Sequence, residues 1–161
     1  MIAVTFKLTK DVTVWNNLKK SFKLAENIED QVGWFPENQY GSDNDNLPMA
    51  QVANWLEEGV ASKNIPPRPF MRVGFKAALS KGANDASFKR IVTAVANGQD
   101  VFKALHKEGD SFRQTLRQVM IDWDTPRNAP TTVELKGFDD PLIETSELIS
   151  NITSKTTKRG T

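Results

Sequence analysis

The sequence predicts an α+β fold: a small, mainly antiparallel sheet, built from both ends of the chain, packs against several helices. Three observations carry this prediction. Residues 2–8 alternate apolar and polar side chains, which is typical of a strand with one buried face. Residues 149–156 indicate a closing strand near the other end. Between them, apolar residues recur every three or four positions, the spacing of amphipathic helices, and the longest helix is expected near 100–123.

The elements that follow the first strand alternate between the two periodicities. A helix is indicated by apolar residues at spacings of four, four and three: Val14, Leu18, Phe22 and Ala25. Residues 29–36 predict a second strand that ends at Pro36, and residues 37–46 are polar and rich in turn formers, as in a surface loop. Pro48 suits the first position of a short helix, which Gly59 should end.

The second half of the chain predicts further helices. Residues 70–82 and 86–98 have helical patterns, with Gly82 and Gly98 as expected stops. Gly109 falls inside the long helix and should weaken or bend it. A compact helix is expected after the long helix. Asn128 should cap it, Pro130 suits its first turn, and Gly137 should end it.

Composition bounds the domain organisation. The 161 residues suit one domain, expected at 1–152, followed by a flexible basic tail at 153–161. The tail contains Lys155, Lys158 and Arg159 and no acid; it is either a solvated end or a segment that orders against a partner or near DNA. The formal net charge of +1 argues against a dedicated nucleic-acid surface. We expect synthesis in the cytoplasm because the chain has no cysteine and starts with no export signal.

The chain offers little catalytic chemistry. With one histidine and no cysteine it cannot assemble the usual structural zinc site. Asp43 and Asp45 have the spacing that begins a calcium loop, but the later positions do not fit that loop. Glu57 and Glu58 are adjacent on a helix and so do not converge on one proton or metal. We therefore expect no catalytic residue, cofactor or metal site, and no enzyme.

The segment "NIPPRPF" at residues 64–70 is unusually stiff for a connection between helices. Its prolines, Pro66, Pro67 and Pro69, each fix φ and remove a backbone donor, and residues before proline are pushed to extended geometry. Two interpretations stay open. The segment is a strut that presents Arg68 and Phe70 to a partner, or it is a rigid corner whose Phe70 fills the chain's own core.

Several segments, in this order, resemble the small tail-completion proteins of long-tailed bacteriophages, a group that includes the lambdoid minor tail component family and the virion-morphogenesis proteins of Mu-like phages. They are "VGWFPEN", "MAQVANWLEEGV…IPPRPFMRVGF" and the closing signature "NAPTTVELKGFDDPLIETSELISNIT". The likeness spans about residues 28–156. The chain departs from the family at Ser146, where the family usually has glycine, the residue that favours positive φ.

The resemblance implies a structural virion protein, made in the host bacterial cytoplasm and placed at the head–tail junction. It would form a homo-oligomeric ring at the head-proximal end of the tail and contact other neck and tail-tube proteins, with DNA only passing through the ring and no small-molecule substrate or membrane involved. The alternatives are a head-closure or connector protein of the same neck and a small nucleic-acid-binding module. The residues expected at subunit or partner contacts are Tyr40, Asp43, Asp45, Pro66, Pro67, Arg68, Pro69, Phe70, Lys155, Lys158 and Arg159.

Overall fold

The computed structural model describes residues 12–159, except for the side chains of residues 81–83. Its elements follow in chain order: α1 (Val12–Ala25), β1 (Ile28–Gly33), α2 (Met49–Glu58), α3 (Phe70–Ala78), α4 (Lys81–Ala96), α5 (Val101–Ile121), α6 (Pro130–Lys136), α7 (Glu147–Ser150) and β2 (Thr153–Lys158). Short 3-10 turns at Ser42–Asn44 and Ala61–Lys63 flank α2. The strand expected at residues 2–8 lies outside the described residues.

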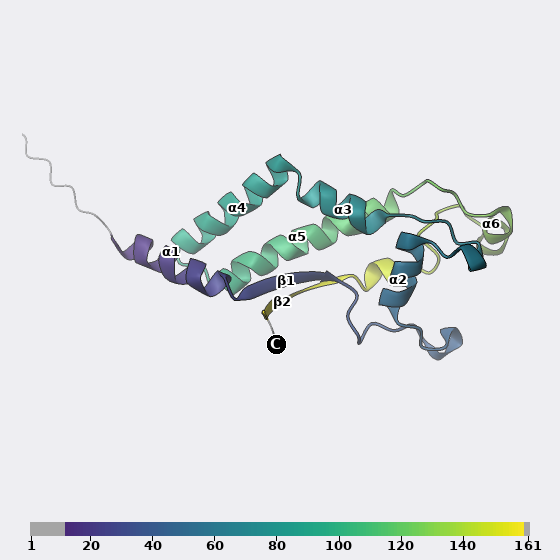
Figure 1. Ribbon diagram of the computed structural model, residues 1–161, viewed down its shortest axis with the longest axis horizontal. Coiled ribbons are helices and arrows are strands. Elements are labelled where there is room, and N and C mark those ends of the chain that lie inside the picture. The colour runs from purple at the N-terminus through teal and green to yellow at the C-terminus, as the bar shows by residue number, and fades with distance from the viewer. Residues whose placement is uncertain (1–11, 160–161) are drawn as a thin grey trace, which may run out of the picture.

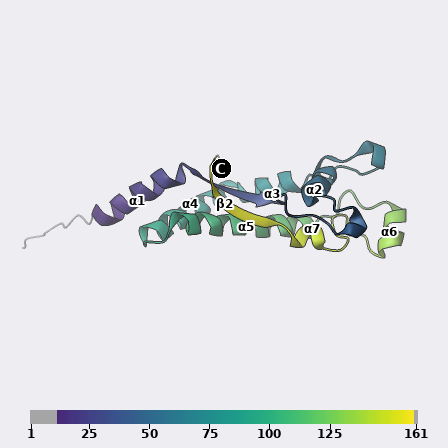
Figure 2. The same ribbon diagram turned by 90° about the horizontal axis from the view of Figure 1, so that it is seen from below.

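The molecule is elongated along α5 (Figure 1). α3 and α4 follow one another along one side of α5, α1 lies at one end, and α2 and α6 lie at the other. β1 and β2 run beside α5 in both views (Figures 1 and 2) and pack against it. The predicted α+β class is therefore confirmed, with its long helix and its small antiparallel sheet.

The sheet joins segments that are far apart in the sequence. β1 pairs with β2 antiparallel, in a register that runs from Ile28 opposite Lys158 to Gly33 opposite Thr153. Residues 153–158 are therefore part of the folded unit, and the expected flexible tail from residue 153 is wrong for them. Threonine is common in strands because its branched side chain suits a pleated surface, and β2 contains three.

α5 is continuous over 21 residues despite Gly109. Asp100 caps its N-terminus: the Asp100 carboxylate accepts hydrogen bonds from the backbone N–H groups of Phe102 and Lys103 at 2.9 and 3.2 Å. Gly109 does not end the helix; it makes room for the sheet, because a Cβ there would overlap the carboxylate of Asp30 on β1. The expectation that Gly82 ends a helix is wrong, since α3 ends at Ala78 and Gly82 lies in the first turn of α4.

The buried apolar side chains form two separate cores. The larger one, at the α2–α6 end, contains nine buried residues: Met49, Ala53, Phe70, Leu116, Met120, Leu142, Leu148, Ile149 and Ile152. The smaller one, between α1, α4, α5 and β1, contains four: Ile28, Val95, Val101 and Ala104. The two cores give the two ends of the molecule very different amounts of internal packing.

Candidate functional site

A pocket of about 360 Å³ lies at the α2–α6 end of the molecule. It lies between α2, α6, the loop before α2, the proline segment and residues 141–148, and we call it the α2–α6 pocket. Two of the three segments that carry the family resemblance line it: Pro66 and Arg68 come from the proline-containing segment, and Asn128 and Lys136 come from the closing signature. The pocket is therefore the first place to look for function.

The proline segment folds back onto the end of α2. Gly59 ends that helix with φ 75°, and a Cβ at this position would lie 2.7 Å from the backbone nitrogen of Pro67. The N–H of Arg68 donates to the carbonyl of Leu56 at 2.7 Å. Only glycine tolerates both the left-handed region and this close approach, so α2 and the proline segment are held together.

An inverse γ-turn then starts α3. Its central residue is Pro69, with φ −77° and ψ 54°, and the N–H of Phe70 donates to the carbonyl of Arg68 at 2.8 Å. Proline suits this turn because its ring already holds φ near −65°. The backbone thus reverses at Pro69, and the side chain of Arg68, the residue before it, is buried.

The guanidinium of Arg68 is buried against its own chain. Nε donates to the carbonyl of Pro126 at 3.1 Å, and Nη2 donates to the carbonyl of Arg127 and to Oδ1 of Asn128, both at 3.3 Å. The residue is only 4% exposed, and burial lowers the pKa of Arg68, although the charge of Asp139 opposes this shift. No carboxylate among the described residues lies within 4.0 Å of this guanidinium.

These contacts correct the picture of an exposed strut. Arg68 was expected to project from the segment; its side chain instead turns inward, where Nε and Nη2 donate to acceptors of its own chain. The expected pairing with a carboxylate or carbonyls of a neighbouring subunit stays a prediction. Phe70 is fully buried in the larger core, where its ring meets Trp34 edge-on at 6.2 Å. The interpretation of a rigid corner is therefore confirmed for Phe70.

Glu57 holds the start of α3. Its carboxylate accepts from the backbone N–H groups of Met71 and Arg72, at 2.8 and 3.2 Å, and pairs with the Arg72 side chain at 3.0 Å. The adjacent Glu58 reaches another nitrogen of the same guanidinium at 2.8 Å. A carboxylate is stabilised at a helix N-terminus by the free N–H groups there. Sequence reasoning missed this contact because Glu57 lies on another helix and no local pattern marks it.

Asn128 does not cap α6 as expected. The cap position is Ala129. The side-chain oxygen of Asn128 accepts from Arg68, and the backbone N–H of Asn128 donates to the Asp139 carboxylate at 3.0 Å. Oδ1 of Asn128, the atom expected to cap α6, therefore accepts a hydrogen bond from Arg68 instead. Later in the same signature, Ser146 has φ 61°, in the left-handed region that glycine favours.

The residues expected at contacts separate into groups. The structure brings Tyr40, Pro66 and Arg68 together in the lining of the α2–α6 pocket. Asp43 and Asp45 are exposed in the loop whose Asn44 borders it. Pro67 is exposed and Pro69 half-buried, and neither lines the pocket.

The basic residues of β2 lie apart from the pocket. Lys155 pairs with Glu37, and its ammonium also lies 4.1 Å from the centre of the Phe35 ring. Lys158 ends β2, and the N–H of Arg159 continues the pairing by donating to Asn27 at 2.8 Å. These three cations therefore belong to the sheet and do not join the α2–α6 pocket.

The α2–α6 pocket holds charges of both signs close to one another. Burial lowers the pKa of Lys136, and the charges of Glu144 and Asp140 oppose this shift more strongly than Arg68 adds to it. Burial raises the pKa of Tyr40 to about 12, and the charges of Glu147 and Glu144 add to this shift. Glu144 therefore acts on both Lys136 and Tyr40, so cations and carboxylates are mixed in the pocket.

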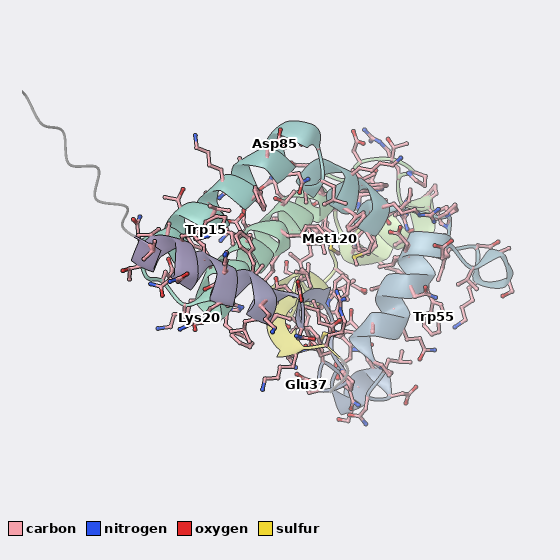
Figure 3. All side chains as sticks on the ribbon, turned by 60° about the vertical axis from the view of Figure 1, so that its left-hand side comes forward. Trp15, Lys20, Glu37, Trp55, Asp85 and Met120 are labelled. Carbon is pink, nitrogen blue, oxygen red and sulfur yellow. The ribbon has the colours of Figure 1, made fainter. Side chains whose placement is uncertain are left out.

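A second candidate surface is apolar and lies at the opposite end. α1 has no buried residue, yet it carries five large apolar side chains that are at least 40% exposed: Val12, Val14, Trp15, Phe22 and Leu24. Figure 3 shows Trp15 on this helix, far from Trp55 on α2. Exposed apolar side chains gathered on one element are typical of interaction surfaces.

Among the described residues, no three or more His, Asp or Glu side chains gather in a way that could hold a metal ion. Within the same residues, no helix is both long and apolar enough to cross a membrane. Comparisons with protein-family models, curated proteins and solved structures find no match to this chain.

Proposed function

We propose that this chain is a structural virion protein of a tailed bacteriophage, a tail-completion subunit that forms a ring at the head-proximal end of the tail and joins it to the head connector. One observation carries the proposal: two of the three segments that resemble the tail-completion family meet in space. Arg68 of the proline-containing segment donates to Asn128, the first residue of the closing signature, and to the carbonyls of Pro126 and Arg127 just before it. Two motifs that depend on each other in the fold are a stronger signal than two short matches.

The backbone at Ser146 also supports the resemblance. The family usually has glycine at this position, and here the residue adopts a left-handed conformation that glycine favours. The turn that the family signature needs is therefore present, although a serine makes it.

The apolar side chains of α1 support the self-association that a ring requires. A ring forms when one surface of a subunit binds a different surface of the next, and when the rotation between them closes. α1 lies at one end of an elongated molecule, so it can meet a neighbour without disturbing the α2–α6 end. Burial of its exposed apolar residues would contribute the hydrophobic part of the interface.

The test is native mass measurement and negative-stain imaging of the purified chain, with and without tail tubes. We expect closed oligomers, either alone or once tail tubes are added, and density at one end of each tube. A chain that stays monomeric in both conditions would contradict the proposal.

A further inference from the structure

Two hydrogen-bond donors at the α2–α6 pocket have no acceptor among the described residues. The Arg68 bonds use Nε and Nη2 and leave Nη1 without a partner. The side-chain Nδ2 of Asn128 is buried and likewise has no partner. Both residues line the pocket. Of the two donors, only Nδ2 of Asn128 is buried away from water, and a buried donor without an acceptor is rare in folded proteins because it loses its bonds to water.

The orientation of the Asn128 amide follows from its neighbour. Its Oδ1 accepts from Nη2 of Arg68 at 3.3 Å. A flipped amide would set a donor against a donor, so Nδ2 must be the atom left without a partner. The guanidinium and the amide therefore offer adjacent donors, and the guanidinium charge has no carboxylate partner within 4.0 Å in the described part of the chain.

We propose that Arg68 and Asn128 bind a carboxylate that a neighbouring copy of the chain inserts into the α2–α6 pocket. This inference rests on the proposed ring. A carboxylate has two oxygens in one plane, and it can accept from the planar guanidinium and from the amide together. Such bonds are charge-assisted, and the ion pair would offset the cost of the buried cation.

The remaining charges of the pocket favour a carboxylate over a phosphate. Lys136 lines the pocket and adds attraction for an anion. Glu144 and Glu147 line it too and repel negative charge, which disfavours a doubly charged anion more than a singly charged one. The volume of about 360 Å³ accommodates one or two side chains, which suits a residue inserted from a neighbour's surface.

Acetate tests the site on the isolated chain, without any assembly. In an isotope-labelled sample we expect saturable shifts of the Asn128 side-chain amide and the Arg68 Nε–H resonances on titration with sodium acetate, at an ionic strength held constant with chloride. Phosphate should produce weaker shifts. Absence of an acetate response, or a response matched by chloride alone, overturns the proposed site.

The variant Asn128→Asp tests the role of the site in assembly. It supplies an internal carboxylate to Arg68 and removes the unpartnered donor, so the isolated chain should keep its thermal midpoint and the Arg68 resonance should no longer respond to acetate. Ring formation should weaken about 10- to 100-fold, the loss expected for charge-assisted hydrogen bonds. Asn54→Asp, on the exposed side of α2, makes the same charge change and should assemble normally.

The outcomes separate the two proposals. Normal assembly of Asn128→Asp overturns the inserted carboxylate and leaves the ring intact. A wild-type chain that never assembles overturns the ring, and with it the neighbour as the source of the carboxylate. The acetate titration still decides in that case whether the pocket binds this chemical group.

Discussion

The two ends of α5 differ in how completely the chain buries its own apolar surface. At the α2–α6 end, nine buried residues form one core around Phe70 and Leu116. Among the described residues, the core at the α1 end has four, and α1 itself buries none. Large apolar side chains are exposed at both ends, including Leu135 on α6 at 89% and Trp15 on α1 at 58%, but only the α2–α6 end combines them with a large core. The difference makes α1 a candidate contact surface.

The largest effect should come from Phe70→Ala. Phe70 is fully buried and Phe75, on the same helix, is 55% exposed, so the pair compares core with surface. We expect Phe70→Ala to lower the free energy of unfolding by about 3–5 kcal/mol, because it leaves a cavity beside Trp34. Phe75→Ala should cost about 1 kcal/mol or less. Urea denaturation measures both, and equal losses would contradict the comparison.

Gly109→Ala should have the next largest effect. In an unconstrained helix this change stabilises by about 1 kcal/mol. Here the new methyl group would overlap the Asp30 carboxylate, so we expect a loss of about 1–3 kcal/mol. In an Asp30→Ala background the overlap disappears, and the same change should become stabilising. An unchanged sign in that background would show that β1 does not approach α5 this closely.

Trp15→Ser tests whether α1 depends on another molecule. Trp15 is 58% exposed, so its loss should change the free energy of unfolding of the isolated chain by no more than about 0.5 kcal/mol. Assembly measured by native mass should nevertheless weaken. Lys20→Ser on the same helix is the matched control and should leave assembly unchanged. A large loss of stability in Trp15→Ser would show that the α1 end is packed after all.

The smallest effect concerns Tyr40 at the packed end, and it is a shift in titration. The pKa of this residue is raised to about 12, first by burial and then by Glu147 and Glu144. Because the folded pKa is above the unfolded value of about 10, the stability from neutral Tyr40 is complete below pH 10 and is lost as the pH rises toward 12. Tyr40 is the sole tyrosine, so tyrosinate absorbance reports on it alone. Glu147→Gln should lower its pKa toward 10; an unperturbed pKa in the wild type would contradict the packed pocket.

Local patterns predicted the helices and the fold class, because apolar periodicity reports directly on which face is buried. The ends of helices and strands were less predictable where a single residue was the only signal. β1 ends at Gly33 and not at Pro36, and the stop expected at Gly82 falls inside α4. A glycine permits a helix end but does not require one, and here Ser80 at the cap position begins the next helix first.

The sequence predicted that the proline segment is rigid, but not that the Arg68 side chain points into the molecule. The prolines indicated a rigid segment at residues 64–70, yet its orientation depends on Gly59 and on acceptors that follow Arg68 by about sixty residues. Glu57 at the start of α3 was missed for the same reason. Long-range contacts of this kind have no local signature, so single-sequence reasoning recovers them only where a resemblance supplies the second partner.

The sheet can form only late in synthesis of the described chain, because β1 and β2 lie near its opposite ends. Thr156 donates to Asp30 at 2.7 Å across a separation of 126 residues, so β1 and β2 can pair only after residues 153–158 have been synthesised. A chain that stops before β2 would leave both the β1 edge and the Asp30 carboxylate unsatisfied beside α5. Folding of the β1 region therefore depends on a segment at the opposite end of the described chain.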